Sequence, residues 1–241
     1  MKRIIIILCI LILILILLSV SLIFFRHQNF VYSGTVEAIE IDITPKITDN
    51  IIKFYVKEGD KVTKGQILAI LDGKDILNSY NYAKTEFERA SEIYKRNATS
   101  KENYDAKKYK YDDATIKKDW LTLKSPIDGK VLYKYYNEGE MAISGKKVLT
   151  LANLKEIDVW IYIPHNTITS ININNKVTGY LPEINKNFTG YIYVINDEAE
   201  FTPKNVQTRS ERERLVYGVK IRFNNDEKLT LKPGMTLEVK F

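Results

Sequence analysis

Two stretches of the chain repeat each other and decide the fold. Residues 51–72 read IIKFYVKEGDKVTKGQILAILD, and residues 131–153 read VLYKYYNEGEMAISGKKVLTLAN. With an offset of 80 they match at an apolar start, at an E-G-[DE] turn, at a second glycine and at an alternating apolar end. Alternation between turn signals predicts short strands, so each copy is expected to form half of a small, flattened β domain.

Glycines are expected to shape the turns of this repeat. Glycine adopts a positive φ without a clash of Cβ, so it suits both turns of each copy. The predicted turn glycines of the two halves are Gly59, Gly65, Gly129, Gly139 and Gly145.

A helical insert separates the two halves. Between Gly73 and Pro126 the chain has neither glycine nor proline, so residues 74–122 are predicted to form an antiparallel coiled-coil hairpin. The hairpin is expected to turn near residues 97–100, where Thr99 or Ser100 can cap the second helix. The predicted seams are Ile76, Tyr80, Ala83, Phe87, Ala90 and Tyr94 in the first helix and, more weakly, Ala106, Tyr109, Asp113, Ile116 and Trp120 in the second.

The start of the chain predicts a membrane anchor. From Ile4 to Phe25 only two serines interrupt the apolar residues. A helix of that length reaches about 33 Å and can cross a bilayer, whereas a cleaved signal peptide needs a shorter apolar run and a small-residue site. Because Lys2 and Arg3 come first, the positive-inside rule predicts a cytoplasmic tip and anchor over residues 1–26, with the bulk of the chain periplasmic.

The C-terminal third predicts a small antiparallel β-barrel. Short alternating strands are separated by turn signals, and the segment that leaves the anchor is expected to add one strand. The barrel would comprise residues 30–41 and 154–241, and the repeat domain residues 42–73 and 123–153. A basic loop at residues 201–214 is expected either to be solvated or to contact a transporter or lipid headgroups.

Composition argues against most enzyme chemistry. The chain of 241 residues has a single cysteine, Cys9, and two histidines, His27 and His165, and it contains no recognisable catalytic motif. We therefore expect no catalytic residue, no metal site and no cofactor. The net charge of +6 comes from 36 basic and 30 acidic residues that are interleaved, so nucleic acid is not an expected partner.

The two halves resemble those of a lipoyl or biotinyl domain, and their separation by a helical hairpin resembles the HlyD-like membrane fusion proteins. These are the periplasmic adaptor subunits of bacterial efflux pumps and secretion systems. The resemblance is carried by ITPKITDNIIKFYVKEGDKVTKGQILAILD, by SPIDG at 125–129 and by the terminal LKPGMTLEVKF. FTPKNVQT at 201–208 is similar to the subgroup paired with ABC-type exporters. Asp49 and Asn50 stand where the family often has glycine, and both tolerate left-handed backbone, so a turn is expected there.

The resemblance implies a mainly β protein that links an inner-membrane transporter, with ABC-type favoured, to a TolC-type outer-membrane channel or the cell envelope. It also implies a homo-oligomeric ring and no enzymatic activity. The family's last, membrane-proximal domain is expected to be missing. Channel-docking members carry Arg, Leu and Ser at the hairpin tip, and their spacing selects Arg89, Arg96 and Ser100, with arginine in the leucine position. The implied partner-binding residues are Arg89, Arg96, Asn97, Ala98, Thr99 and Ser100.

A lipoyl or biotinyl carrier protein is the alternative function. Such a carrier needs a lysine at the tight turn that joins the two halves, and Lys74 lies one residue from that position. The helical insert and the predicted export both argue against this alternative.

Overall fold

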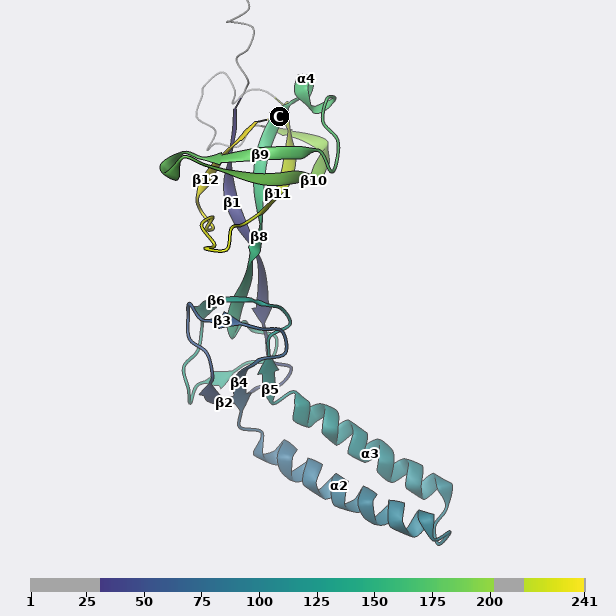
Figure 1. The fold of residues 1–241 in the computed structure, drawn as a ribbon. Coiled ribbons are helices and arrows are strands. Elements are labelled where there is room, and N and C mark those ends of the chain that lie inside the picture. Colours follow the sequence, from purple (N-terminus) through teal and green to yellow (C-terminus); the bar gives the residue numbers. More distant parts are fainter. Residues whose placement is uncertain (1–30, 202–214, 241) are drawn as a thin grey trace, which may run out of the picture. The chain divides into compact units, whose positions relative to one another are not determined.

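The computed structural model describes residues 31–201 and 215–240 (Figure 1). Its contacts form two compact units, which are treated separately. The repeat unit contains residues 38–157 and 225–232, and the described part of the barrel unit contains residues 31–37, 158–201, 215–224 and 233–240. The predicted anchor at residues 1–26 lies outside the described residues.

Within the described ranges, no helix has both the length and the apolar character needed to span a membrane.

The repeat unit is built from short antiparallel strands that follow the predicted repeat. One sheet has the order β5-β4-β2-β7, while β3 pairs with β6 and β6 pairs with β8. Two long strands, β1 and β8, continue from this unit into the barrel unit. The strands are β1 (Tyr32–Ile43), β2 (Asp49–Phe54), β3 (Lys61–Val62), β4 (Ile67–Leu71), β5 (Thr122–Lys124), β6 (Gly129–Lys134), β7 (Met141–Ala142) and β8 (Leu149–Pro164).

Two glutamates tie the halves together by equivalent hydrogen bonds. Glu138 Oε1 accepts from the backbone N–H of Phe54 at 2.9 Å, and Glu58 Oε1 accepts from that of Lys134 at 2.8 Å. Both partners of the first bond lie 80 residues from their counterparts in the second. The E-G turn of each half therefore closes on a strand of the other half.

The glycines that follow these glutamates also form hydrogen bonds with the opposite half. The N–H of Gly139 donates to Ile51 O at 2.7 Å, and that of Gly59 donates to Val131 O at 2.9 Å. Ile51 and Val131 are themselves buried at equivalent places in the shared apolar core. Further core pairs at the same offset are Leu68 with Val148, Leu71 with Leu151, and Ile43 with Leu123.

Four of the predicted turn glycines have left-handed backbone, and the fifth has another role. Gly129 was expected in a turn but is the first residue of β6. A Cβ at this position would lie 2.5 Å from Ala152 O, so glycine lets β6 approach β8 closely. The φ angles of the other four are 90° for Gly59, 86° for Gly65, 87° for Gly139 and 76° for Gly145.

The expected left-handed turn at Asp49 and Asn50 is wrong. Both residues lie in β2, and neither is among the described non-glycine residues with positive φ. Asp49 Oδ2 instead accepts from the N–H of Gly73 at 2.9 Å. Gly73 has a φ of 52° and opens the first helix, so Asp49 fixes the point where the chain leaves the sheet.

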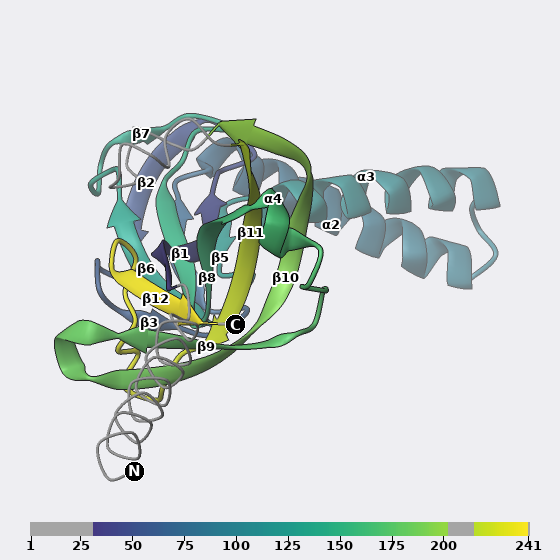
Figure 2. The same cartoon turned by 90° about the horizontal axis from the view of Figure 1, so that it is seen from above.

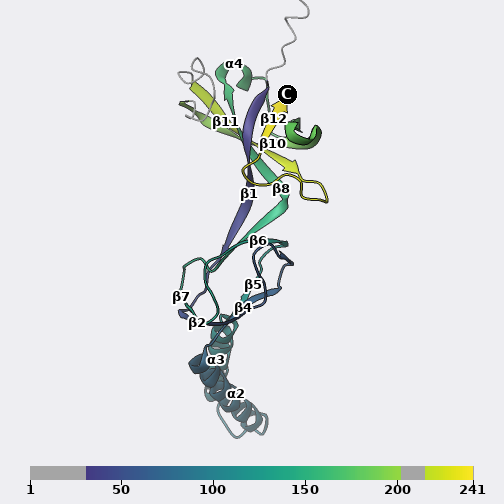
Figure 3. The same ribbon diagram turned by 90° about the vertical axis from the view of Figure 1, so that its left-hand side faces the viewer.

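The insert between β4 and β5 is a helical hairpin, as predicted. Helix α2 (Lys74–Lys95) and helix α3 (Lys101–Asp119) lie side by side (Figure 3). The chain enters the hairpin from β4 and returns to β5, which are neighbours in the sheet. Both ends of the hairpin are therefore held by one pair of strands.

The barrel unit is a closed set of six strands. Their order is β1-β12-β9-β10-β11-β8, and an additional pairing of β1 with β8 closes it (Figure 2). On its wall, Asp158 accepts two hydrogen bonds from Arg222, at 2.8 and 3.1 Å, and this contact raises the pKa of Arg222. The remaining elements are α4 (His165–Ile168), β9 (Lys176–Leu181), η1 (Pro182–Ile184), β10 (Lys186–Phe201), β11 (Leu215–Asn224) and β12 (Thr236–Lys240).

The two equivalent glutamate hydrogen bonds predict that removal of either glutamate side chain destabilises the protein to the same extent. We expect Glu58→Ala and Glu138→Ala each to lower the free energy of unfolding by about 0.5–1 kcal/mol, because each leaves a backbone N–H without its acceptor. Urea unfolding of the full chain in detergent measures the effect. Glu58→Gln and Glu138→Gln keep the acceptor oxygen and serve as controls; glutamine variants as unstable as the alanine variants would assign the effect to charge instead.

Candidate functional site

The end of α2 is closed by backbone hydrogen bonds that make the hairpin tip compact. Asn97 has a φ of 56°, and its N–H donates to Tyr94 O at 2.9 Å. The next N–H, of Ala98, donates to Ile93 O at 3.0 Å. This pair of bonds around a left-handed residue is the Schellman motif, for which asparagine is a natural substitute for glycine.

The start of α3 is closed by a side chain. Ser100 Oγ accepts from the N–H of Asn103 at 3.1 Å, which confirms that Ser100 is the helix cap. Thr99 takes a supporting role, since its Oγ1 accepts from Asn103 Nδ2 at 2.9 Å. The tip, residues 96–100, is therefore a short turn with a cap on each side.

The structure brings five of the six predicted partner-binding residues together at the tip. Thr99 is half-buried, while the other four tip residues are exposed. Arg89 lies apart from them, because seven residues of helix place it about 10 Å from Arg96 along the axis.

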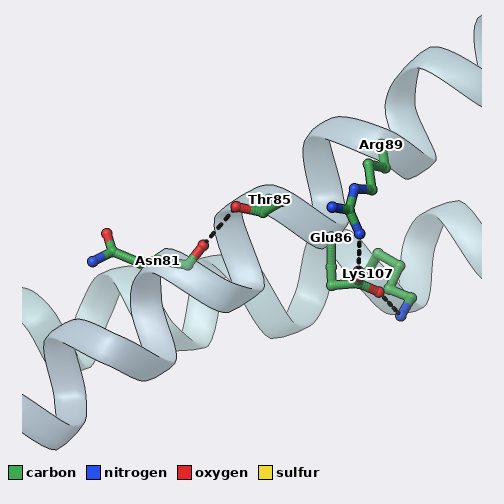
Figure 4. A network of polar contacts seen from close by, with 5 residues as sticks. All are labelled: Asn81, Thr85, Glu86, Arg89 and Lys107. Atoms are coloured by element: carbon green, nitrogen blue, oxygen red, sulfur yellow. Dashed lines mark hydrogen bonds and ion pairs between the residues drawn. The ribbon is translucent and has the colours of Figure 1, made fainter.

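Arg89 belongs to an ionic contact that joins the two helices (Figure 4). Glu86 Oε2 lies 2.7 Å from Lys107 Nζ on α3, and Glu86 Oε1 lies 3.3 Å from Arg89 Nη1. The Lys107 ammonium, with a smaller contribution from Arg89, lowers the pKa of Glu86, and Glu86 in turn raises the pKa of Lys107. Sequence analysis missed this contact because Lys107 was not placed in the seam.

Aromatic rings fill the interface behind the tip. Tyr104 stacks on Tyr94 with centroids 4.8 Å apart and also contacts Phe87 at 5.7 Å. Tyr111 stacks on Phe87 at 5.3 Å and contacts Tyr80 at 5.8 Å. The α2 rings come from the predicted seam of the first helix, which these contacts confirm. Such ring pairs add to the stability of the hairpin and support the tip.

The predicted seam of α3 is wrong. Tyr109 is 74% exposed and Ile116 is 54% exposed, whereas Ala114 is buried. Lysine explains the error, since a lysine stem can line an interface while its ammonium reaches outward. Lys118 Nζ, for example, lies 4.2 Å from the centroid of the Tyr80 ring. The α3 residues that face α2 are Tyr104, Lys107, Tyr111, Ala114 and Lys118.

Lys74, the lysine considered for a carrier function, lies at the base of the hairpin. It is the first residue of α2, its side chain is 80% exposed, and its Nζ lies 3.1 Å from Asp72. The connection between β4 and β5 contains both helices, so Lys74 is not at a tight turn.

Comparison with known proteins shows that the chain is similar to membrane fusion proteins. Residues 39–152 match the family model of the barrel-sandwich hybrid domain of RND membrane fusion proteins. A solved MacA–MexA chimera, which contains the α-hairpin domain of Pseudomonas aeruginosa MexA, aligns with a TM-score of 0.71 and 25% identity over 88% of this chain and 80% of the chimera. Residues 39–152 are therefore similar to the barrel-sandwich hybrid domain of membrane fusion proteins, and the fold of the chain is similar to that of the chimera.

Two further proteins are similar to the chain over different shares of their length. The UPF0194 membrane protein YbhG of Salmonella arizonae is 31% identical over 121 residues, which cover 50% of this chain and 36% of that protein. The chain thus aligns with about a third of this curated relative. The membrane fusion protein Spr0693 from Streptococcus pneumoniae R6 has the same fold, with a TM-score of 0.64 and 19% identity over 88% of this chain and 97% of Spr0693.

Acid is expected to destabilise the contact between the two helices of the hairpin. The lowered pKa of Glu86 means that its contribution to stability is complete above the ordinary carboxyl value of 4.5 and is lost as the pH falls through the lower folded-state value. Glu86→Gln should therefore melt below the parent chain at neutral pH, and the difference should shrink as the pH falls below 4.5 through the lowered folded-state pKa of Glu86. Thermal unfolding followed by circular dichroism measures this.

Glu88→Gln is the matched control, because its contact with Lys84 is long, at 3.9 Å. A Glu86→Gln difference that persisted unchanged in acid would show that the carboxylate does not stabilise the hairpin.

Proposed function

We propose that the chain is the adaptor subunit of an export system, linking an inner-membrane transporter to an outer-membrane channel or to the cell envelope. Its predicted anchor would hold it in the inner membrane with the N-terminus cytoplasmic. Copies would assemble into a ring, and the protein would work without catalysing a reaction. The match of residues 39–152 to the membrane fusion protein domain model and the similarity of the fold to the MacA–MexA chimera support this role.

The observation that carries the proposal is the capped tip of the hairpin. Helix α2 has 22 residues, which gives a spacer about 33 Å long. Ser100 and the Schellman bonds satisfy the backbone at the tip, so the exposed side chains are held on a rigid turn. A rigid surface loses little conformational entropy when it binds, which suits it to docking on another protein.

An ABC-type transporter is the favoured partner. The support is the resemblance of FTPKNVQT at 201–208 to the subgroup paired with ABC-type exporters. Residues 202–208 lie outside the described part of the chain, so this support comes from sequence alone. The basic residues of the same loop would give the transporter a positively charged contact.

Replacing the tip tests the proposed docking. We expect a chain with residues 96–100 exchanged for a five-residue Gly-Ser linker to lose export, because the linker removes the docking side chains and both caps. Export of the system's substrate by cells that carry the variant is the measurement, with membrane-bound protein quantified by immunoblot.

Asn97→Gly is the matched control. Glycine keeps the left-handed turn that the Schellman motif needs, so this variant should fold normally and show how much the asparagine side chain contributes. Normal export by the linker variant at parental protein level would remove the tip from the mechanism.

A further inference from the structure

A cluster of lysines surrounds the E-G turn of the first half of the repeat unit. Lys57 and Lys61 flank this turn, and Lys64 lies in the turn that follows. Lys61 pairs with Lys130 across β3 and β6 (Figure 1). The Lys130 side chain runs along the E-G turn, because a Cβ on Gly59 would lie 3.9 Å from Lys130 Cε. The lysine patch consists of Lys57, Lys61, Lys64 and Lys130.

The ammonium groups of the lysine patch have no ion-pair partner in the described part of the chain. Nearby carboxylates bind backbone groups instead. Asp60 Oδ2 accepts from the N–H of Lys57 at 3.0 Å, and Asp128 Oδ1 accepts from the N–H of Lys64 at 2.8 Å. Glu58 accepts from a backbone N–H of the other half, as described above. The carboxylates therefore hold the turns, while the ammonium groups extend from them without a partner.

The second half forms the same backbone contacts without any lysine. The N–H of Asn137 donates to Glu140 Oε2 at 2.8 Å, and the N–H of Ser144 donates to Thr48 Oγ1 at 3.0 Å. Each of these bonds lies 80 residues from its counterpart in the first half. The turns of the repeat unit therefore do not need lysine side chains to form.

The paired lysines of β3 and β6 also have neutral equivalents. At the offset of 80 they correspond to Met141 and Asn50, which pair across β7 and β2. Two like charges directly opposite each other in a sheet repel and lower stability. Stability therefore does not explain the lysine patch, whereas binding of an anion does. The four equivalent positions in the second half are all exposed and uncharged, and they are occupied by Asn50, Asn137, Met141 and Ser144.

We propose that the lysine patch binds a phosphate-bearing polymer, in which negative charges recur along a flexible chain. The ammonium group of lysine is a compact point charge that binds phosphate without a fixed orientation, and the patch contains no arginine, the residue that favours planar carboxylates. Residues 57–66 contain one aliphatic side chain, Val62, and it is only 3% exposed. Protein interfaces centre on apolar and aromatic side chains, so an anionic polymer fits this surface better than a protein does.

Exchange of residues between equivalent positions tests the lysine patch. In the patch variant, each lysine is replaced by the residue that occupies the equivalent position of the second half. We expect the affinity of the full chain in detergent for labelled inorganic polyphosphate to fall about tenfold at low salt, because four exposed charge contacts are lost. Fluorescence anisotropy measures the affinity, and circular dichroism checks the fold. The substitutions are Lys57→Asn, Lys61→Met, Lys64→Ser and Lys130→Asn.

The converse exchange moves the patch to the second half. Added to the patch variant, it should restore the affinity for polyphosphate, because the backbone of the two halves is equivalent. Its substitutions are Asn50→Lys, Asn137→Lys, Met141→Lys and Ser144→Lys. A hairpin variant is the matched control, since it removes four exposed lysines and the same net charge, and it should change the affinity little. Its substitutions are Lys95→Gln, Lys101→Gln, Lys108→Gln and Lys110→Gln.

The outcomes decide both the surface and the chemistry of its partner. Loss of affinity in the patch variant alone, reversed by the converse exchange, would support the inference. Equal loss in the patch and hairpin variants would overturn it, because net charge would then explain the binding. Binding of poly-glutamate as tight as that of polyphosphate would also overturn it, since the partner would then be an acidic protein segment or another carboxylate polymer. None of these measurements depends on export, so the proposed function is tested separately.

Discussion

Each half of the repeat unit supplies acceptors that the backbone of the other half needs. Glu58 and Glu138 accept from equivalent N–H groups, and Gly59 and Gly139 donate across the same boundary. Each half thus leaves part of its backbone to be satisfied by the other half, which couples the folding of the two although about fifty residues separate them. This mutual dependence allows a helical hairpin to be inserted between the halves without breaking the domain.

The equivalence of the halves also explains where in the repeat unit the helical hairpin is inserted. Leu71, at the end of β4, corresponds to Leu151 of β8, and Leu123 of β5 corresponds to Ile43 of β1. The hairpin therefore occupies the connection that corresponds, in the repeat, to the place where β8 and β1 continue into the barrel unit. The repeat unit thus has two equivalent places where the chain leaves it. The helical hairpin follows one of them, and the barrel unit follows the other. The proposed adaptor role needs both.

Prediction succeeded where local rules dominate. Four of the five turn glycines, the break at the tip, the Ser100 cap and the seam of α2 all follow from spacing and from the backbone preferences of glycine and serine. Prediction failed where a long, charged side chain occupied a position in the helix interface. Lys107 and Lys118 lie in the α3 interface, so a pattern that counts only apolar residues shifted that seam onto the exposed face.

The sequence alone determined the repeat, the helical insert, the strand-rich remainder and the resemblance to membrane fusion proteins, because periodicity and glycine spacing can be seen in short stretches of the chain. Only the tertiary structure decided which glutamate serves which strand, that Asp49 fixes the start of α2, and that Tyr109 and Ile116 face outward. These features depend on residues far apart in the chain meeting at defined distances.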